Sequence, residues 1–506
     1  MQPLTTDISV AVIGAGAMGS GIAQVAAQAG HRVFLLDQRE GAAEAGRQSI
    51  AGQLQRRVDK GKMEQASLDA LLARIEPVKE LSELAEAGLI IEAIIEDLEI
   101  KRSLLANLEE VCGDNAILAT NTSSISVTAL GARMKHPGRL VGMHFFNPAP
   151  LMALVEVIKG LATSDEIAQR VYATAAQWGK KPVTATSTPG FIVNRVARPF
   201  YAESLRLLQE QAADSATLDA ILREAGGFRM GAFELTDLIG HDVNYAVTSS
   251  VFNSYYQDTR FLPSLVQKEL VEAGRLGRKS GQGFYSYAEG AQKPEPVTAA
   301  AASSEANTLV VEGNPGPLAA LIARLKESGL NIIERDGPGR LRFGEAVLAL
   351  TDGRMATERA TAEACNHLVL LDLAFDYAKA SRLAIAAADQ ASLQAITDAC
   401  ALLQKAGIAV SQIADRPGLV IMRTLATLAN EAADAALHGV ASVSDIDLAM
   451  KAGLNYPEGP LRWSDNLGFS LVHTVLTNIQ QSYGEDRYRP ALLLRKNRFA
   501  EKGFYS

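Results

Sequence analysis

The stretch SVAVIGAGAMGSGIA, from Ser9 to Ala23, decides the fold of this chain. It opens with a short apolar run that ends at a glycine, as a buried strand does. Gly14, Gly16 and Gly19 then give the spacing G-x-G-x-x-G, and small apolar residues follow as in a packed helix. In such a unit the first glycine permits the tight turn, the second lets a pyrophosphate approach the backbone, and the third allows close helix packing. The stretch therefore predicts a dinucleotide-binding βα unit with phosphate at the helix N-terminus.

The next apolar run, HRVFLLD, predicts a second strand that ends at Asp37. A carboxylate at this position can accept hydrogen bonds from both hydroxyls of an adenosine ribose, and it repels a 2′-phosphate. The sequence therefore favours NAD over NADP as the cofactor. Arg39 stands close enough to weaken that preference slightly, and a glycine turn without any ligand remains the alternative.

One segment has the length of a membrane span, because residues 8–30 contain no charged side chain. Four glycines interrupt the segment, however, and Asp7 precedes it. No Lys or Arg occurs before Arg32, so neither the flank of a signal peptide nor that of a membrane helix is present. We expect a buried βα unit here and no membrane partner.

Length and composition describe a folded protein of several domains. A chain of 506 residues predicts three or four compact units. Its hydrophobic content of 48% and charged content of 21% exclude a wholly disordered or fibrous chain. The net charge of −8 has the wrong sign for a chain devoted to nucleic acid, and the three cysteines lack the spacing of a disulfide framework or a metal site. We expect no nucleic acid, no metal and a reducing, cytoplasmic location.

Strand and helix patterns alternate through the first part of the chain, which predicts a parallel, doubly wound sheet. Helical patterns dominate from about Thr188 onwards. The predicted fold is α/β: a doubly wound parallel Rossmann sheet followed by helical domains, with a degenerate second α/β domain and a second helical copy. The predicted parts are a NAD-binding domain at 1–187, a helical domain at 188–287, an exposed linker at 288–307, the degenerate α/β domain at 308–412 and the second helical copy at 413–506.

An internal duplication underlies this division. The segment TPGFIVNR, which begins at Thr188, reappears as RPGLVIMR from Arg416, an offset of 228 residues. The same offset relates further glycines and acids, and GFYS closes both copies. Such copies can pack on each other with pseudo-twofold symmetry. Helical tails of this kind also form dimer interfaces, so both a homo-oligomer and a pairing within one chain remain open.

The second α/β segment resembles a worn copy of the first. A strand and a turn recur at residues 310–317, but Pro315 and Pro317 remove two backbone N–H donors where phosphate would need them. The counterpart of Asn194 is Met422, which offers no useful hydrogen bond to a carbonyl. We therefore expect one active site per chain, in the first half.

His144 is the strongest candidate for acid–base chemistry. It lies in HFFNPAPLMALVEVI, where two prolines break the strand and LVEVI can return beside it with Glu156. An imidazole can take the proton of a hydroxyl near neutral pH, and a neighbouring carboxylate orients the ring and stabilises its cationic form. From the pattern alone, a buried structural histidine remains the more common case.

The residues of the first half resemble the 3-hydroxyacyl-CoA dehydrogenase family of fatty-acid and aromatic-acid catabolism. Several motifs in family order carry the resemblance: GAGAMGSGIA at 14–23, EAIIEDLEIK at 92–101, NTSS at 121–124, HFFNP at 144–148, PGFIVNR at 189–195, ELTDLIG at 234–240 and GRKSGQGFY at 277–285. Together these motifs are specific, although the glycine motif alone is not. The whole chain is similar to long bacterial members with a duplicated tail, which are often associated with phenylacetate breakdown.

The resemblance implies an NAD-dependent oxidation of (S)-3-hydroxyacyl-CoA to 3-oxoacyl-CoA. It also implies a role for six side chains. These are His144 as general base with Glu156 as its partner, Ser123 and Asn194 near the substrate hydroxyl and thioester carbonyl, and Glu96 and Lys101 on the nicotinamide side. Lys60 and Lys62 are candidates for the CoA phosphates, although a charge run is usually a solvated helix face.

The acyl chain is the least determined part of the reaction. Where the family commonly has PMGPFEL, this chain has RMGAFEL, beginning at Arg229. An arginine facing the acyl end would favour a dicarboxylyl substrate such as 3-hydroxyadipyl-CoA over 3-hydroxybutyryl-CoA. Two other hypotheses remain: a dehydrogenase of small hydroxy acids without CoA, and an NAD-binding redox sensor, which would not need His144 or Glu156.

Overall fold

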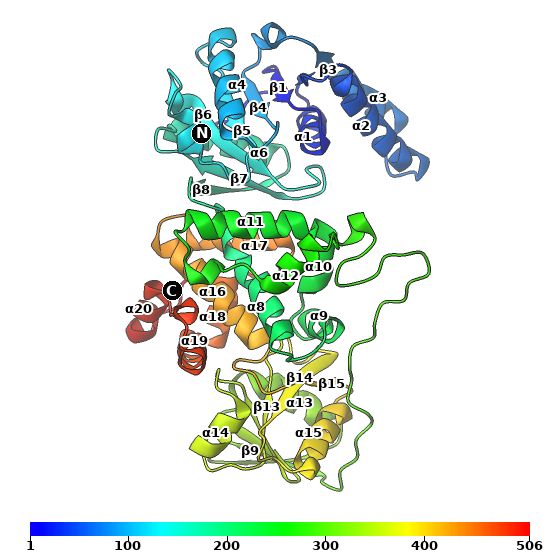
Figure 1. The fold of residues 1–506 in the computed structure, drawn as a ribbon, viewed down its shortest axis with the longest axis vertical. Helices are drawn as coiled ribbons and strands as arrows, with labels where there is room; N and C mark the ends of the chain where they lie inside the picture. The colour runs from blue at the N-terminus through cyan, green and yellow to red at the C-terminus, as the bar shows by residue number, and fades with distance from the viewer. The chain divides into compact units, whose positions relative to one another are not determined.

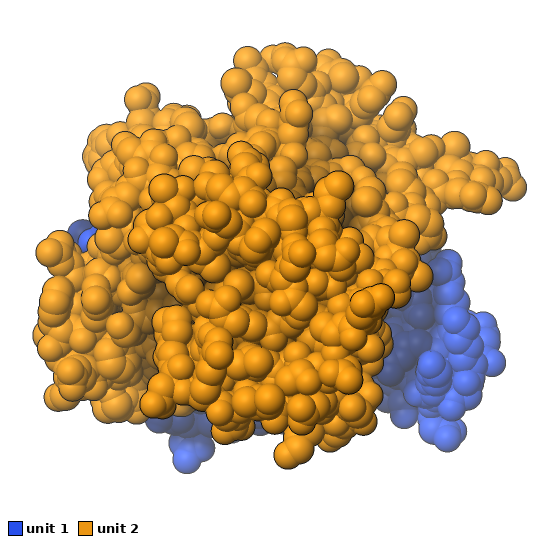
Figure 2. Space-filling view, turned by 90° about the horizontal axis from the view of Figure 1, so that it is seen from below, with its two compact units in different colours: residues 1–195, 438–454 blue, residues 196–437, 455–506 orange.

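The computed structural model describes all 506 residues, which form two compact units (Figures 1 and 2). Unit 1 consists of residues 1–195 and 438–454, and unit 2 of residues 196–437 and 455–506. Unit 1 therefore contains a helix from the second half of the chain, α17 (Val443–Leu454), which packs against the sheet strands β7 and β8. None of the helices combines the length and apolar character needed to cross a membrane.

Unit 1 is built on an eight-stranded sheet in the order β3-β2-β1-β4-β5-β6-β7-β8. Neighbouring strands are parallel except for β6 and β7, which are antiparallel. The predicted doubly wound α/β fold is confirmed. The strands are β1 (Val10–Ile13), β2 (Val33–Leu36), β3 (Ile75–Val78), β4 (Leu89–Glu92), β5 (Ile117–Thr120), β6 (Leu140–Phe145), β7 (Leu154–Lys159) and β8 (Lys181–Thr186).

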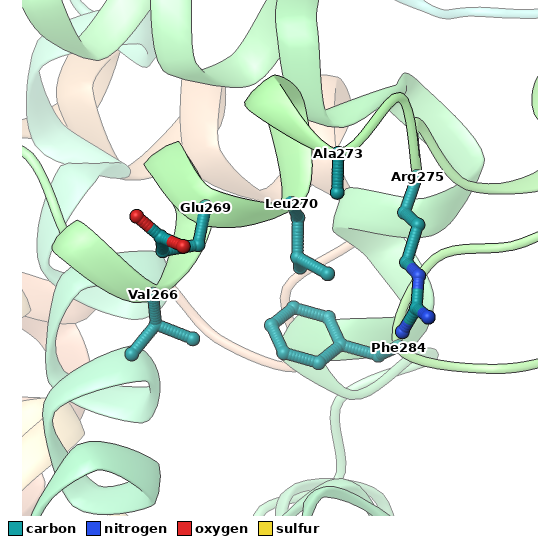
Figure 3. Close-up of a pocket in the computed structure, with 6 residues that line it drawn as sticks. All are labelled: Val266, Glu269, Leu270, Ala273, Arg275 and Phe284. Carbon is teal, nitrogen blue, oxygen red and sulfur yellow. The ribbon is translucent and has the colours of Figure 1, made fainter.

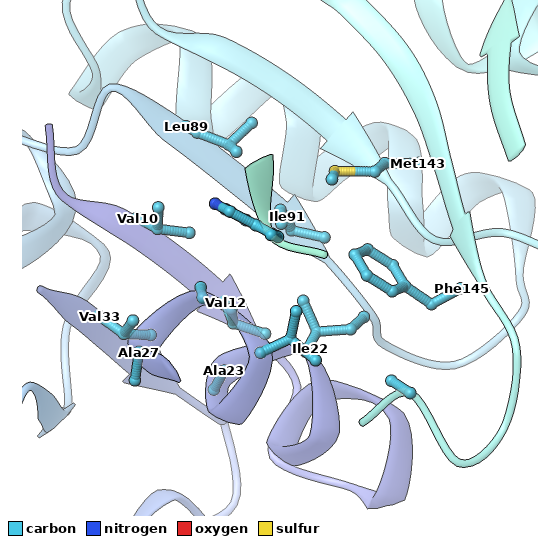
Figure 4. Close-up of a cluster of buried hydrophobic side chains, with 14 of the residues drawn as sticks. Val10, Val12, Ile22, Ala23, Ala27, Val33, Leu89, Ile91, Met143 and Phe145 are labelled. Atoms are coloured by element: carbon cyan, nitrogen blue, oxygen red, sulfur yellow. The ribbon is translucent and has the colours of Figure 1, made fainter. Parts of the chain in front are cut away.

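Helices cover this sheet because its central strands are buried along their whole length. All four residues of β1 and of β4 are buried, which is why both strands read as unbroken apolar runs. The small residues of α1 (Ala17–Gln28) let it lie close to β1, and Ile22 and Ala23 pack there with Val12 (Figure 4). The other helices are α2 (Ala42–Asp59), α3 (Gln65–Ala73), α4 (Leu98–Val111), α5 (Val127–Gly131), α6 (Asp165–Gln177) and α7 (Val193–Val196), the last of which crosses the boundary between the units.

Unit 2 contains both helical copies, and the long helices of the two copies pack on each other. Helix α16 (Ile421–Leu437) contacts α8 (Arg198–Gln209), and the fully buried Arg423 donates to Glu203 Oε2 at 2.6 Å. The pairing within one chain is therefore formed in this structure. The other helices of the two copies are α9 (Ser215–Glu224), α10 (Ala232–Ile239), α11 (His241–Ser254), α12 (Leu265–Glu272), α18 (Pro460–Leu467), α19 (Phe469–Tyr483) and α20 (Leu492–Ala500).

The duplication extends to backbone conformation and to side-chain anchors. Phe191 and Leu419, related by the offset of 228 residues, both have positive φ, at 46° and 53°. In the first copy the Asp237 carboxylate accepts the backbone N–H groups of residues 284 and 285, and in the second copy Asp465 accepts those of 504 and 505. The GFYS segments thus dock in the same way, each on the aspartate near the end of a helix.

Residues 288–307 contain no helix or strand, but hydrogen bonds hold them along unit 2. Val297 N–H donates to Thr217 Oγ1 at 2.8 Å, and Ala299 N–H donates to the Val410 carbonyl at 2.7 Å. The Gln404 amide donates to the Ala300 carbonyl at 2.9 Å. The segment is therefore an exposed strap with fixed contacts.

The second sheet, also in unit 2, has seven strands in the order β10-β9-β11-β12-β13-β14-β15. Three of its six pairings are antiparallel, so the sheet is mixed. Its elements are β9 (Thr308–Glu312), α13 (Ala319–Glu327), β10 (Asn331–Arg335), β11 (Arg340–Phe343), β12 (Ala346–Leu350), α14 (Ala356–Ala362), β13 (Leu368–Leu371), β14 (Arg382–Ala387), α15 (Leu393–Lys405) and β15 (Ala409–Gln412).

The crevice that would hold a dinucleotide is filled in this second sheet. In the first sheet, β1 has parallel neighbours on both sides, which leaves a crevice at its carboxyl end. In the second, the antiparallel β11 begins at the carboxyl end of β9, and Gly339 N–H donates to the Glu312 carbonyl at 2.7 Å. A Cβ on Gly313 would lie 2.0 Å from the Gly337 carbonyl oxygen. The turn at 337–339 therefore occupies the space that a pyrophosphate requires.

We predict that the chain binds one equivalent of NAD, measured by isothermal titration calorimetry. Gly16→Val should abolish this binding without unfolding the chain, because a Cβ at Gly16 meets no protein atom within 4 Å and would project into the space for the pyrophosphate. Circular dichroism checks the fold of the variant. Two equivalents in the wild type, or one that survives in the variant, would contradict the prediction.

Candidate active site

The antiparallel pairing of β6 with β7 places His144 directly opposite Glu156. The ring nitrogen Nδ1 lies 2.7 Å from Glu156 Oε2, and both side chains are buried. Since an ionised carboxylate only accepts hydrogen bonds, Nδ1–H donates and the lone pair lies on Nε2. The sequence brought these two residues together correctly.

Glu156 also anchors the chain where the helical segment begins. Its other oxygen, Oε1, accepts the backbone N–H groups of Ile192 at 3.1 Å and Val193 at 3.0 Å, at the N-terminus of α7. These donors satisfy a fully buried carboxylate and favour its ionised form. The carboxylate is therefore held in place from two sides, and it fixes the plane of the imidazole.

Aromatic side chains enclose the histidine, whose second nitrogen makes no hydrogen bond. The ring of Phe146 lies 4.6 Å from the His144 ring centroid, and that of Phe191 lies 5.9 Å away, edge on. Nε2 has no partner within the chain, although His144 is only 6% exposed. The arrangement gives a base in an apolar setting with one nitrogen free to meet a substrate.

Glu96 organises the NTSS segment that follows β5. Its Oε1 accepts from Thr122 Oγ1 at 2.7 Å and from the backbone N–H groups of Ser123 and Ser124 at 2.9 and 3.0 Å. Burial acts to raise the pKa of Glu96, but these hydrogen bonds and the charge of Lys101 outweigh it and hold the pKa below its usual value. Asn194 Nδ2 donates to the Ser123 carbonyl at 3.4 Å, so the structure brings Ser123, Asn194 and Glu96 together.

Lys101 is directed at carboxylates, and the more buried of them, Glu92, was not singled out from the sequence. The Lys101 ammonium is 1% exposed and lies 2.5 Å from Glu92 Oε1 and 3.3 Å from Glu96 Oε2. Glu92 in turn accepts from Thr120 Oγ1 at 2.8 Å. Its position at the end of β4, a charge inside an apolar run, was the available signal. Any action of Lys101 on a bound cofactor therefore passes through the position of Glu96.

The glycine loop fits a dinucleotide. Gly14 has φ of 101°, and a Cβ there would lie 2.5 Å from the Ala93 carbonyl oxygen. A Cβ on Gly19 would lie 1.6 Å from the Gly14 carbonyl oxygen, so only glycine permits this packing of α1 on the loop. Around Gly16 the space is open, as the approach of a pyrophosphate requires.

Asp37 stands at the end of β2, where a ribose would lie, but it is already hydrogen-bonded. Its oxygens accept from Ala15 N–H at 2.8 Å, Arg39 N–H at 2.9 Å, and Arg39 Nε and Nη2, both at 3.0 Å. The bond from Arg39 lowers the pKa of Asp37 to about 2. The Arg39 side chain is 69% exposed, so ribose hydroxyls can displace it without loss of a buried contact.

The remaining candidates lie away from this cluster. Lys60 and Lys62 are exposed just after α2, and Arg229 is exposed in unit 2 between α9 and α10. A cavity of about 470 Å³ in unit 2 is lined by α12 and Phe284 and contains none of the predicted site residues (Figure 3). No group of three or more His, Cys, Asp or Glu side chains in the chain could hold a metal ion.

Three family models match the chain. Residues 9–188 match the NAD-binding domain of 3-hydroxyacyl-CoA dehydrogenase, and residues 190–287 and 418–504 both match its C-terminal domain. The chain belongs to the 3-hydroxyacyl-CoA dehydrogenase family. It is an NAD-dependent oxidoreductase with a duplicated C-terminal domain. Residues 348–417 match the reduced Rossmann-fold domain of 3-hydroxybutyryl-CoA dehydrogenase.

Relatives of this family member share its length. A 3-hydroxyadipyl-CoA dehydrogenase of Escherichia coli K12 is 46% identical over 98% of this chain and 99% of its own. The crystal structure of a 3-hydroxybutyryl-CoA dehydrogenase from the same organism has 45% identity and a TM-score of 0.89, with 98% and 99% of the two chains covered. A probable 3-hydroxybutyryl-CoA dehydrogenase of Deinococcus radiodurans is 41% identical over 54% of this chain and 99% of its own, and so resembles one half.

The second half of the dehydrogenase retains the register of the His–Glu pair but not its chemistry. The offset of 228 residues relates His144 to Asp372 and Glu156 to Ala384, and Asp372 N–H donates to the Ala384 carbonyl across β13 and β14. The Asp372 carboxylate accepts the N–H groups at the start of α16, at 2.8 to 3.1 Å. Burial raises its pKa to about 6. One aspartate thus fills the helix-capping place of Glu156, and no imidazole remains.

We predict that His144→Ala lowers kcat/KM by at least about 100-fold, because the base on the substrate hydroxyl is lost. The affinity for NAD, measured by fluorescence titration, should stay nearly unchanged since His144 lies outside the glycine loop. Glu156→Gln serves as the matched variant: it keeps an acceptor oxygen but removes the charge, so its loss should be smaller. Undiminished turnover in His144→Ala would overturn the role.

We predict that Asp37→Ala reduces the preference for NAD over NADP in kcat/KM by at least about tenfold, because a repelling charge near the 2′-position disappears. With its pKa at about 2, Asp37 is ionised throughout the working range. The wild-type preference should therefore be flat from about pH 5 to about pH 9. A preference that changes across this range, or that survives in the variant, would count against Asp37.

Proposed function

We propose that this dehydrogenase acts on a short or dicarboxylyl (S)-3-hydroxyacyl-CoA, with 3-hydroxyadipyl-CoA as the preferred substrate, in phenylacetate or fatty-acid catabolism. The full-length relative named 3-hydroxyadipyl-CoA dehydrogenase supports this choice. The similar crystal structure is named for 3-hydroxybutyryl-CoA instead, which makes that thioester the alternative substrate. The relatives therefore agree on the reaction and differ on the acyl chain.

The observation that carries the mechanism is the free Nε2 of a histidine whose Nδ1 is held by Glu156. In the proposed reaction Nε2 takes the proton of the 3-hydroxyl, and the carbon–oxygen bond becomes a carbonyl as the carbon loses its hydrogen. NAD⁺, when bound, accepts that hydrogen with its electron pair. The Glu156 carboxylate stabilises the imidazolium that forms, because it is buried at 2.7 Å from the ring.

Ser123 and Asn194 are proposed to orient the substrate beside this base. Their link through the Ser123 carbonyl keeps the two polar groups together, and Glu96 fixes the loop that carries Ser123. Glu96 and Lys101 are proposed to shape the nicotinamide side, Lys101 by holding Glu92 and Glu96 in place. A 3-hydroxy thioester needs such groups to align its carbonyl and its alcohol at the same time.

The remaining assignments are weaker and are proposed on chemistry alone. Lys60 and Lys62 are exposed cations that suit the phosphates of CoA. The three cysteines are free and buried, which fits a reducing, cytoplasmic setting. We propose no nucleic-acid partner for this acidic chain, and we expect any homo-oligomer to use surfaces other than the α8–α16 contact.

The substrate proposal is tested by following NADH absorbance over a panel of substrates. We expect kcat/KM for 3-hydroxyadipyl-CoA to exceed that for 3-hydroxybutyryl-CoA by about tenfold or more, the effect of one charge-assisted hydrogen bond. Free 3-hydroxybutyrate should give no turnover. The reverse preference would establish the 3-hydroxybutyryl-CoA alternative, turnover of the free acid a hydroxy-acid dehydrogenase, and inactivity on every compound a redox sensor.

A further inference from the structure

An arginine inside unit 2 has no acidic partner. Arg198, the first residue of α8, is 5% exposed, and its one hydrogen bond goes from Nη1 to Thr248 Oγ1 at 3.0 Å. Its Nε is buried without a partner. Thr248 Oγ1 itself donates to the Asn244 carbonyl, so it contributes no charge. The guanidinium therefore offers donors to a group that the chain does not supply.

The groups around Arg198 are aromatic and neutral. The Tyr201 ring centroid lies 4.9 Å from the guanidinium carbon, and Tyr201 and Tyr456 are the ionisable groups that act on it. Tyr456 Oη is also buried without a hydrogen-bond partner. Burial lowers the pKa of Arg198, but an arginine remains charged in a protein. Two unsatisfied polar groups, one cationic and one a hydroxyl, thus stand in the same buried place.

Other buried arginines of unit 2 have acids. Arg423 is bound by Glu203 at 2.6 Å, and Arg382 by Glu224 at 3.1 Å. Burying a charge is costly unless it is paired, so an unpaired buried guanidinium in a chain that otherwise pairs its arginines points to an anionic ligand. Its planar donor edge matches a carboxylate, which it can bind with two parallel hydrogen bonds.

We propose that Arg198 binds the distal carboxylate of a dicarboxylyl-CoA substrate, with Tyr456 as an additional hydroxyl donor. This inference rests on the proposed function and deepens it, because it names the group that selects a dicarboxylyl chain. Chain length supports it: Asn194, proposed to meet the thioester end, stands four residues before Arg198, and four residues extend over at most about 14 Å. One acyl chain can bridge that distance.

Arg198 suits this role better than the exposed Arg229. An exposed arginine binds a carboxylate in competition with water and salt, whereas a desolvated one gains more from the same contact. A buried cation also rejects a substrate that ends in a methyl group, because its donors then stay unsatisfied. Arg229 is therefore the matched control: a cation of the same type in the same unit that lies on the surface.

The test compares two thioesters of equal length, (S)-3-hydroxyadipyl-CoA and (S)-3-hydroxyhexanoyl-CoA, on the full chain. Arg198→Met should lower kcat/KM for the adipyl substrate by about 10- to 100-fold, mainly through KM, and leave that for the hexanoyl substrate unchanged or improved. Arg198→Lys should retain part of the preference. Arg229→Met should leave the ratio of the two substrates as in the wild type.

Two further measurements separate recognition from folding and from the reaction. Arg198→Met should melt at the wild-type temperature or above, because an unpaired buried charge has been removed. Calorimetry with adipyl-CoA and hexanoyl-CoA, which carry no 3-hydroxyl, should show the preference for adipyl-CoA in the wild type only. Equal losses for both thioesters with a lowered melting temperature would assign Arg198 a structural role and overturn the inference. A wild type that binds both thioesters equally overturns it as well, whereas retained adipyl-CoA selectivity without turnover would instead defeat the proposed function.

Discussion

The hydrogen bond between His144 Nδ1 and Glu156 Oε2 is the interaction on which the active half of this enzyme depends. It exists because β6 and β7 are antiparallel and in a register that sets the two residues opposite each other. A slip of one residue would turn Glu156 to the other face of the sheet. The second carboxylate oxygen takes the N–H groups that open α7, so the same side chain joins the sheet, the base and the start of the helical segment.

The second half shows what remains when this interaction is lost. Asp372 and Ala384 keep the register of His144 and Glu156, and Asp372 still caps the following helix. The fold needs a carboxylate at the helix start, whereas only the reaction needs the imidazole. The antiparallel β11 has also filled the crevice beside β9. The duplicate thus retains packing functions, including the contact of Arg423 with Glu203.

The treatment of buried charge distinguishes the two regions of chemical interest. Around the NTSS segment, Lys101 is balanced by Glu92 and Glu96, and each carboxylate has further donors, which gives a rigid support for Ser123. Around Arg198 no acid balances the cation. A satisfied network fixes positions, while an unsatisfied group is available to a ligand, so the two arrangements suit positioning and recognition respectively.

The sequence by itself determined the glycine loop, the strand-ending carboxylate Asp37, the duplication and the pairing of His144 with Glu156. All of these depend on short spacings or on one constant offset, which follow directly from the periods of strands and helices. Only the tertiary structure decided that Arg39 covers Asp37, that Lys101 is directed at Glu92, that the second crevice is filled, and that Arg198 has no acidic partner. These facts concern which distant side chains meet and which lose water, and no local pattern in the chain reports either.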